Sequence, residues 1–492
     1  MRDQFSLLQA LYLFLLPLFF IFHEYIGYYP AIPLISSIGI FLQLLLMIAG
    51  LVLINNFIFK SFNKASLFTF TIIFLYLFYG AAFDFFKDIF GHSIFIKYTF
   101  ILPFLFVFLI WTFIFIKKSK PINLELIKFL SLVLIVLICY DTITFIASKS
   151  SKERDKVRVV SPKLKYEALQ YKPDIYLIVT DEYAGNEVLD NNFNFDNNSF
   201  INELNQRNFK HIQYSRSNYN STIFSMASML HLNYLKIKSD SITLQTILEC
   251  GNLLNETPFV NFLKQHNYTF YNYSCFDVNN QSKAIRVYFF PTFEELYLSQ
   301  TLISRVKRDI GFNFLSPKVI ESHVKLNLTK DSTIDDLTRK AVNQTGSPKF
   351  IYTHFFMPHH PYFINKDSNN KTYSNLELAL NQNKDAYISY LKFANNKILD
   401  LIEYIQTNSK NPPVIILLSD HGWRKNETKE TNHHQFINLS AISLPDSNYS
   451  FFDDKLSNVN QLRMLLNTYF KQSLSKLKDS TYFLIEDEIG TK

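Results

Sequence analysis

The pattern of hydrophobic and polar positions divides this chain into two halves. Residues 1–147 are almost continuously apolar, whereas the remainder is polar and rich in asparagine. A bilayer core about 30 Å thick requires roughly 20 apolar residues of helix to cross it. The stretches that reach this length are Leu7–Tyr28, Ile35–Phe57, Leu67–Phe86, Tyr98–Ile116 and Phe129–Ala147. They predict a transmembrane anchor of about five helices over residues 1–148, and not a cleaved signal peptide or a set of buried core helices.

Basic residues in the loops between these stretches predict the orientation of the anchor. The loop between the first and second stretches has none, and Lys87 and Lys97 flank the loop between the third and fourth. The second and fourth loops carry Lys60, Lys64, Lys117, Lys118 and Lys120. Because Lys and Arg are enriched in cytoplasmic loops, the N-terminus is predicted to be cytoplasmic. After five spans, the polar half then lies outside the cytoplasm, on an inner or plasma membrane.

The polar half begins with a charged segment and continues with alternating strands and helices. Residues 149–170 are dense in Lys, Arg, Ser and Glu, which is typical of a solvated linker. Short apolar runs predict buried strands, and longer amphipathic runs predict helices. The predicted strands are 174–180, 268–273, 350–354 and 414–418, and the predicted helices are 259–265 and 381–405. Asparagine- and serine-rich tracts at 191–199 and 367–375 are predicted loops. The alternation indicates an α/β domain over residues 171–492, with a mostly parallel sheet flanked by helices.

Charge and cysteine content narrow the function classes only slightly. The net charge of +7 is modest for 492 residues, and the basic residues are scattered among acidic ones, which argues against nucleic acid as a partner. Cys139 lies in an apolar stretch, where an inert packing role is expected. Cys250 and Cys275 fall in the polar half and are compatible with either a disulfide or two buried thiols.

Two predicted strands end in acidic residues. Asp181 and Glu182 follow the strand 174–180, and Asp420 and His421 follow the strand 414–418 within the sequence Ser-Asp-His-Gly. Ligands of open α/β sheets bind beyond the carboxyl ends of the strands. Carboxylates together with an imidazole form a ligand set for a divalent metal, and this mixture suits Zn²⁺ or Mn²⁺ better than Ca²⁺.

Hydroxyl side chains stand at the start of another predicted helix. Ser221 and Thr222 lead into the apolar run 223–230. One interpretation is an ordinary helix N-cap. The other is a nucleophilic hydroxyl at a helix N-terminus, where free backbone N–H groups attract an anionic substrate and a bound metal lowers the hydroxyl pKa.

Histidines cluster after the strand 350–354. His354, His359 and His360 lie within the sequence HFFMPHHPY, and this density favours contacts to an oxyanion or to a metal. Farther on, His433 and His434 belong either to a substrate-facing loop or to solvated surface.

Charged residues also lie near the ends of the apolar stretches. Glu24, Asp84 and Asp88 are placed where they could mark a transport path. Their position close to the membrane interface favours anchoring, or the presentation of a lipid substrate, over transport.

Taken together, these motifs resemble the alkaline phosphatase superfamily. The segments DEY, STIFS, HFFMPHHPY and SDHG, over about residues 170–445, are most similar to the sulfatase-like branch that contains phosphoethanolamine transferases and lipoteichoic acid synthases. The resemblance implies that Glu182, Asp420 and His421 are metal ligands, with Asp181 adding to the metal shell. It implies that Thr222 is the nucleophile and also contacts the metal, a register that Tyr234 supports. It further implies that His359 acts on the substrate phosphate and that His354 and His434 bind substrate.

The sequence departs from the sulfatase pattern at the nucleophile. Sulfatases need a Cys or Ser in the context C/S-x-P-x-R, whereas Thr222 is followed by Ile223 and Phe224, and Met226 stands in place of the arginine. The expected function is therefore a membrane-bound, metal-dependent phosphotransferase. It would move a phospho-headgroup, such as phosphoethanolamine or glycerol phosphate, to a lipid or glycan of the cell envelope. The alternatives are a phosphodiester or sulfate ester hydrolase of the same fold, and a non-catalytic membrane scaffold.

Overall fold

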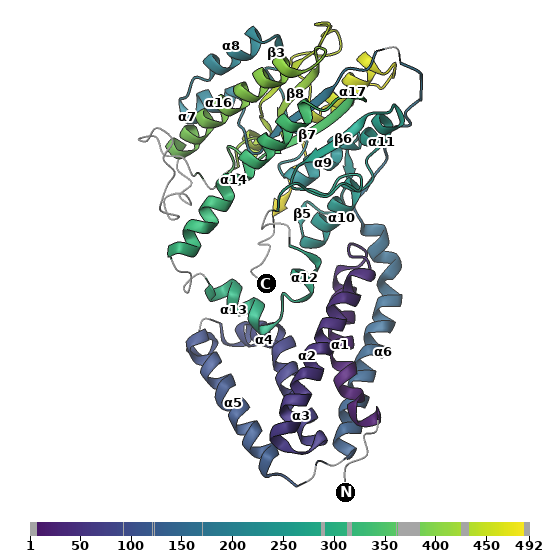
Figure 1. The fold of residues 1–492 in the computed structure, drawn as a ribbon, viewed down its shortest axis with the longest axis vertical. Helices are drawn as coiled ribbons and strands as arrows, with labels where there is room; N and C mark the ends of the chain where they lie inside the picture. Colours follow the sequence, from purple (N-terminus) through teal and green to yellow (C-terminus); the bar gives the residue numbers. More distant parts are fainter. Residues whose placement is uncertain are drawn as a thin grey trace. The chain divides into compact units, whose positions relative to one another are not determined.

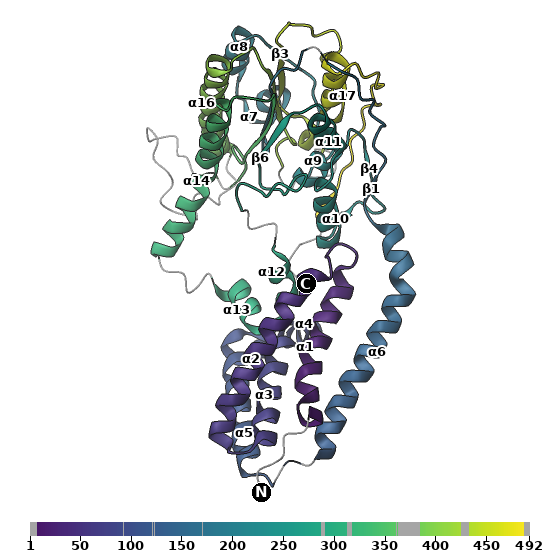
Figure 2. The ribbon, with the colours of Figure 1, turned by 45° about the vertical axis from the view of Figure 1, so that its right-hand side comes forward.

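The computed structural model describes residues 7–91, 93–120, 122, 124–169, 171–286, 291–311, 317–360, 362, 384–424 and 432–486. The chain forms two compact units, shown in Figures 1 and 2. The first, called the membrane unit, comprises residues 1–155, 288–315 and 490–492. The second, called the catalytic unit, comprises residues 156–287 and 316–489.

The membrane unit is built from apolar helices that match the predicted stretches. They are α1 (Leu7–Tyr28), α2 (Ile35–Phe59), α3 (Phe62–Leu77), α4 (Tyr79–Phe90), α5 (Tyr98–Lys118) and α6 (Leu124–Asp155). A short 3-10 helix, η1 (Ile94–Ile96), precedes α5. Four of the helices (α1, α2, α5 and α6) are long and apolar enough to cross a membrane, and the pair α3–α4 makes five if it counts as one span.

The third predicted stretch is broken, because α3 and α4 meet at an angle of 58°. Gly80, at the start of α4, donates its backbone N–H to the carbonyl oxygen of Gln300 at 2.7 Å. A Cβ at Gly80 would lie 2.7 Å from that same oxygen, so a larger residue could not allow the approach. The break therefore lets a distant segment of the chain contact the backbone of this helix.

That distant segment runs from 291 to 311 and returns from the polar half to the membrane unit. It contains α12 (Phe293–Tyr297) and α13 (Leu302–Ile310). Arg305, on α13, pairs with Asp84 of α4, and Tyr98 of α5 donates a hydrogen bond to Asp309 at 2.5 Å. The predicted division at residue 148 did not anticipate this return, because nothing in the local pattern distinguishes these helices from those of the α/β domain.

A six-stranded sheet forms the centre of the catalytic unit, in the order β3-β9-β8-β2-β7-β6. The strands are β2 (Ile175–Thr180), β3 (Phe209–His211), β6 (Thr269–Tyr273), β7 (Lys349–Phe355), β8 (Val414–Ser419) and β9 (Ser440–Ser443). The pairs β8–β2, β2–β7 and β7–β6 are parallel, whereas β9 is antiparallel to both of its neighbours. The predicted α/β class with a mostly parallel sheet is confirmed.

Helices cover both faces of this sheet. Figure 2 shows α8 (Asn198–Gln206), α14 (Pro317–Val342) and α16 (Lys384–Asn408) on one side. The other side carries α9 (Thr222–Leu230), α11 (Pro258–Gln265) and α17 (Asn458–Tyr469). Every residue of β2, β7 and β8 is buried, as expected for parallel strands covered on both faces. The remaining elements are α7 (Asn186–Phe193), α10 (Leu244–Leu254), η3 (Asn432–Phe436), β1 (Arg158–Val159), β4 (Leu235–Lys236), β5 (Ser241–Ile242) and β10 (Ile485–Glu486).

The structure bears on the predicted loops and on the cysteines of the polar half. The tract 191–199 is not a continuous loop, because α7 ends at Phe193 and α8 begins at Asn198, so only residues 194–197 connect the helices. The tract 367–375 lies outside the described residues. Cys250 and Cys275 are both buried and unpaired, which decides the open choice in favour of two thiols.

Candidate metal centre

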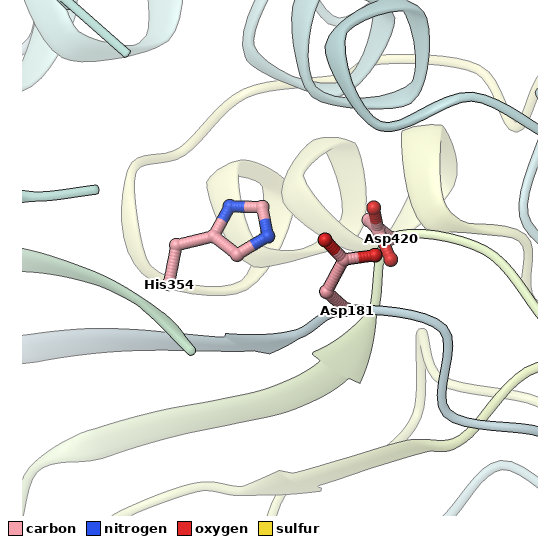
Figure 3. Close-up of side chains that lie close together, drawn as sticks. All are labelled: Asp181, His354 and Asp420. Carbon is pink, nitrogen blue, oxygen red and sulfur yellow. The ribbon is translucent and has the colours of Figure 1, made fainter. Parts of the chain in front are cut away.

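Three buried side chains converge at the carboxyl ends of adjacent strands. Asp181 follows β2, His354 is the penultimate residue of β7 and Asp420 follows β8. The register places His354 opposite Val179, and Thr180 opposite Ser419. One ligand atom from each side chain falls within 4.8 Å of the others, and each residue is at most 1% exposed (Figure 3).

Each of these side chains has a polar atom without a hydrogen-bond partner among the residues that the structure describes. The atoms are Asp181 Oδ1, His354 Nε2 and Asp420 Oδ2. A buried polar atom without a partner costs about 1–3 kcal/mol, so an arrangement that leaves three together is unfavourable by itself. Two carboxylate oxygens and an imidazole nitrogen match the donors that hold Zn²⁺ or Mn²⁺. The cluster therefore fits a divalent metal.

His421 directs a fourth donor atom at the same place. Its Nδ1 lies 2.8 Å from the carbonyl oxygen of Gly422, so Nδ1 carries the proton and Nε2 carries the lone pair. Nε2 is 3.6 Å from Asp181 Oδ1 and 3.4 Å from Asp420 Oδ2. Lone pairs that face one another at these distances repel unless a cation lies between them. This geometry supports the prediction that Asp181, Asp420 and His421 share a metal.

Glu182 occupies a strained backbone position at the edge of the cluster. Its φ is +62°, a left-handed conformation that is uncommon for residues other than glycine and is often retained at functional sites. Its N–H donates to Asp420 Oδ1 at 3.2 Å, and its Oε1 accepts from the backbone N–H of Arg424 at 2.7 Å. The Tyr387 hydroxyl donates to its carbonyl oxygen at 2.9 Å. These contacts hold the conformation and fix the carboxylate beside Asp420.

Thr222 is the first residue of α9 and faces His421. Its Oγ1 lies 3.3 Å from His421 Nε2, and the residue is 7% exposed. Ser221 stands at the N-cap position but makes no side-chain capping hydrogen bond. Of the two candidate hydroxyls, Thr222 is the one that the structure places against a residue of the cluster.

Arg424 brings positive charge to the same edge, beside the His359 imidazole. His359 Nε2 lies 3.8 Å from Glu182 Oε2 and 3.4 Å from Arg424 Nη2. Arg424 also approaches the carbonyl oxygen of Asn220, the residue two positions before Thr222, at 3.5 Å. Guanidinium groups recognise phosphate and carboxylate oxygens with paired N–H donors. The edge thus combines acids that suit a metal with a cation that suits an oxyanion.

Burial shifts the pKa values of these groups in a consistent direction. It raises the pKa of Asp181 well above its usual value, and the charge of Asp420 adds to that effect. Burial lowers the pKa of His354 to about 4 and also lowers the pKa values of His421 and His359. At neutral pH the imidazoles are therefore uncharged, which is the form that binds a metal.

The surrounding residues keep the SDHG loop in place. Ser419 accepts a hydrogen bond from the Tyr183 N–H at 2.9 Å and donates to the His421 carbonyl oxygen at 2.6 Å. A Cβ at Gly422 would lie 2.4 Å from the Ile437 carbonyl oxygen and 2.5 Å from that of His434. Only glycine can approach residues 434–437 this closely, which explains why the SDHG motif ends in glycine.

The structure places the remaining predicted histidines, His434 and His354, in different surroundings. His434, on η3, places its Nδ1 3.3 Å from Asn192 Nδ2 and packs edge to face against the His433 ring, and its substrate role stays a prediction. His354 was predicted to bind substrate, whereas the structure places it among the carboxylates. Pro361 of the histidine motif lies outside the described residues. Sequence reasoning missed Arg424, although its position three residues after His421, at a strand end, was a usable signal.

Comparisons with known proteins bear on the family. A model of the Sulfatase family matches residues 173–450, which is more than half of the chain. No curated protein matches the chain. The match spans all of the acids and histidines of the candidate site described above.

Several solved structures resemble the chain at low identity. The C-terminal periplasmic domain of EptC from Escherichia coli shares 13% identity, covers 68% of this chain and 95% of its own, and gives a TM-score of 0.38. The same domain of phosphoethanolamine transferase EptC from Campylobacter jejuni shares 13%, with 64% and 96% covered and a TM-score of 0.36. A protein of the alkaline phosphatase superfamily from Vibrio parahaemolyticus shares 11%, with 64% and 74% covered and a TM-score of 0.38.

The family rests on the Sulfatase match, and the site geometry agrees with it independently. Acids at the ends of β2 and β8, a histidine beside each of them and a hydroxyl at a helix start are joined in one place, although they lie up to 240 residues apart in the chain. This chain belongs to the Sulfatase family, within the alkaline phosphatase superfamily.

Proposed function

We propose that this protein is a membrane-bound, metal-dependent phosphotransferase that uses Thr222 as its nucleophile. It moves a phospho-headgroup, such as phosphoethanolamine or glycerol phosphate, from a phospholipid to a lipid or glycan of the cell envelope. The observation that carries this proposal is the position of the Thr222 hydroxyl, 3.3 Å from His421 Nε2 and beside a buried cluster of unpaired metal-ligand atoms.

The proposed metal ligands are Asp181, Glu182, Asp420, His421 and Thr222 itself. The position of His354 adds a further donor to this set. A bound Zn²⁺ or Mn²⁺ would lower the pKa of the Thr222 hydroxyl and polarise a phosphoryl oxygen. The raised pKa of Asp181 agrees with this assignment, since a buried acid of this kind needs a neighbouring cation in order to ionise at neutral pH.

The chain's own residues can support a two-step transfer. In the first step Thr222 Oγ1 gives up its proton and forms a bond to phosphorus, the bond between phosphorus and the lipid oxygen breaks, and the departing lipid alkoxide takes up that proton. The phosphothreonine is then attacked by an acceptor hydroxyl, which regenerates Thr222. Free N–H groups at the start of α9, together with His359 and Arg424, would bind the non-bridging oxygens in both steps.

The nucleophile's surroundings argue against sulfate ester hydrolysis. Met226 stands where the sulfatase motif has an arginine, and it is fully buried. An apolar side chain at this position cannot take over the arginine's contacts to the modified cysteine or serine. The hydroxyl of an unmodified threonine suits displacement at phosphorus instead. The apolar spans of the membrane unit agree with an amphiphilic donor.

The test is intact-mass analysis of the full-length protein in detergent after incubation with phospholipid and Mn²⁺ or Zn²⁺. We expect a covalent adduct on the wild type that maps to Thr222 and is absent from Thr222→Ala, and its mass identifies the transferred group. Ser221→Ala is the matched control, because it removes the neighbouring hydroxyl from the same turn, and we expect it to form the adduct.

Other outcomes would separate the alternatives. An adduct on both alanine variants would place the nucleophile elsewhere. Phospholipid turnover without any trapped adduct would indicate a hydrolase that passes the group to water. A folded protein that binds neither Zn²⁺ nor Mn²⁺ would support the non-catalytic scaffold.

A further inference from the structure

The membrane unit contains a polar cavity that the proposed chemistry does not use. The cavity measures about 600 Å³ and lies between α4, the loop to α5, and α13. Its lining includes four cations and two acids: Lys87, Lys97, Arg305, Arg308, Asp84 and Asp309. All of these residues belong to the same compact unit, so the cavity does not depend on how the two units are placed.

The two acids of this cavity are already engaged. Asp84 pairs with Arg305, and Asp309 pairs with Arg308 at 2.7 Å and also accepts a hydrogen bond from Tyr98. The acids therefore balance the two arginines. What remains is the charge of the two lysines, which leaves the cavity with a net excess of positive charge.

Unused donors point to an anionic ligand. Arg305 is 1% exposed, and its Nε–H has no hydrogen-bond acceptor among the described residues. Its guanidinium is held in place by Asp84, by the carbonyl oxygen of Gly80 and by the ring of Phe83, 5.6 Å away. In the described part of the chain the ammonium groups of Lys87 and Lys97 make no hydrogen bond or ion pair. A fixed guanidinium beside two available ammonium groups is a phosphate-binding arrangement.

The surface around the cavity indicates where that phosphate comes from. Large apolar side chains on α4, η1 and the start of α5 are at least 41% exposed: Phe85, Phe86, Ile89, Phe90, Ile94, Phe95 and Phe100. The surfaces of soluble proteins rarely expose so many large apolar side chains side by side, whereas lipid-facing surfaces do. A lipid with its chains against these residues would present its headgroup to Lys87 and Lys97.

The position along the helices agrees with a headgroup site. The cavity lies at the α4–α5 end of the membrane unit, and His23 and Glu24 near the end of α1 line an adjoining cavity that shares Asp84. This is the end that the distribution of lysines predicts to be extracytoplasmic. Basic side chains at the ends of spans reach the level of the lipid phosphates.

We infer that this cavity binds the phosphate of a glycerophospholipid headgroup, as a site separate from the Thr222 centre. Lys87 and Lys97 supply the net charge, and Arg305 supplies a fixed donor. A role of this cavity in loading a donor or acceptor lipid rests on the proposed function. The binding of the headgroup phosphate does not.

The test measures lipid binding by native mass spectrometry on the full-length Thr222→Ala protein, so that no transfer can occur. The probes are dioleoyl phosphatidylglycerol and dioleoyl phosphatidylethanolamine, with dioleoylglycerol as a probe that lacks phosphate. The variant is Lys87→Gln with Lys97→Gln. The matched control is Lys60→Gln with Lys120→Gln. It removes the same charge from exposed positions just after the C-terminal ends of α2 and α5, away from the cavity.

We expect phosphatidylglycerol to bind the Lys87/Lys97 variant about tenfold or more weakly than the parent, because each basic group near a lipid surface contributes roughly a fivefold effect. The control pair should change binding by less than about twofold. Dioleoylglycerol should bind weakly to every variant.

Three results would overturn the inference. Equal losses in both lysine pairs would show general surface attraction, and equal binding of dioleoylglycerol would show that the phosphate is not recognised. Displacement of the lipid by an equal concentration of inorganic phosphate would assign the cavity to a soluble anion. Because binding is read without turnover, failure here leaves the Thr222 adduct test untouched, and failure of that test leaves this one untouched.

Discussion

The membrane unit and the catalytic unit place their apolar side chains in opposite ways. On α2, Leu46, Leu53 and Phe57 are each at least 73% exposed, whereas Ile415, Ile416 and Leu417 on β8 are 0% exposed. Both segments are strongly apolar, but α2 is 25 residues long and β8 has six. The length of an apolar run, more than its composition, decides whether it faces lipid or forms a core strand.

Polar side chains are also distributed in opposite ways in the two units. The catalytic unit buries Asp181, Asp420 and His421 completely or nearly so, where they oppose one another. In the membrane unit Asp84, in the middle of α4, and Asp309, near the end of α13, pair with arginines. Buried acids that lack partners lower stability unless something binds them, so the contrast separates a site built for chemistry from one built for attachment.

The largest effect is expected from Asp420→Asn, which tests whether the buried acids serve chemistry or folding. Asparagine keeps the Oδ1 that accepts the N–H groups of Glu182 and His421, at 3.2 and 2.8 Å, and removes only the charge. We expect Thr222 adduct formation to fall by about a thousandfold or more, since a metal supplies several kcal/mol of charge stabilisation.

The same variant should leave the metal-free fold intact or slightly more stable, because one of two neighbouring acids no longer ionises. Adduct rate and thermal unfolding of the metal-free protein, measured side by side, check both parts. An unfolded variant would show that Asp420 is needed for the fold, and full activity would remove it from the site.

A second prediction compares the apolar side chains of the two units directly. Leu417→Ala should lower the free energy of unfolding of the catalytic unit by about 2–5 kcal/mol, because it opens a cavity between covered sheet faces. Leu53→Ala, at a position on α2 that is 73% exposed, should change the free energy of unfolding of the membrane unit by less than about 0.5 kcal/mol.

The two tryptophans make this comparison measurable. Trp423 is buried in the catalytic unit and Trp111 lies on α5 of the membrane unit. Urea unfolding followed by Trp423 fluorescence in a Trp111→Phe background therefore reports the effect of Leu417→Ala on the catalytic unit. Trp111 fluorescence in a Trp423→Phe background reports the effect of Leu53→Ala on the membrane unit. Similar losses from both alanines would mean that α2 is packed against protein at Leu53 and does not face lipid.

Sequence alone predicted the parts of the fold with strong local signals. The buried strands β2, β7 and β8 are short, mostly apolar runs, and each was located to within one residue at either end. The spans are long apolar runs and were also located, although α6 runs from Leu124 to Asp155, beyond the predicted 129–147. Strands β3 and β9 have three and four residues, too few for a periodic pattern, and they were missed. The break at Phe78 was missed because it depends on Gln300, which is distant in sequence.

The site was predictable residue by residue but not as an arrangement. Asp181, Glu182, Thr222, Asp420 and His421 all stand at element ends that a sequence pattern can locate. The position of His354 beside Asp181, with Asp181 between it and Asp420, follows from the order β8-β2-β7, which no local pattern encodes. Arg424 was missed for the same reason, since its partners His359 and Asn220 are 65 and 204 residues away.

The smallest expected effect concerns Asp331 on α14, a partly buried acid of the catalytic unit outside the proposed ligand set. Burial raises the pKa of Asp331 to about 6, from an ordinary value of 3.8, while its Oδ1 accepts the Phe356 N–H at 2.7 Å. The folded state then holds the Asp331 proton more tightly than the unfolded state does. The stability that this provides is complete below about pH 4 and is lost as the pH rises through 6.

Asp331→Asn keeps the acceptor oxygen and removes the ionisation, so its free energy of unfolding should not show this loss. Between pH 4.5 and 7.5 we expect the wild type to lose on the order of 1 kcal/mol relative to the variant, measured by urea unfolding of the metal-free protein. Asp336→Asn, exposed on the same helix, is the matched control for a simple change of net charge. If the profiles of wild type and Asp331→Asn run parallel, the folded protein accommodates an ionised Asp331 at no cost. The penalty for burying acids in this unit would then be confined to the strand ends around Thr222.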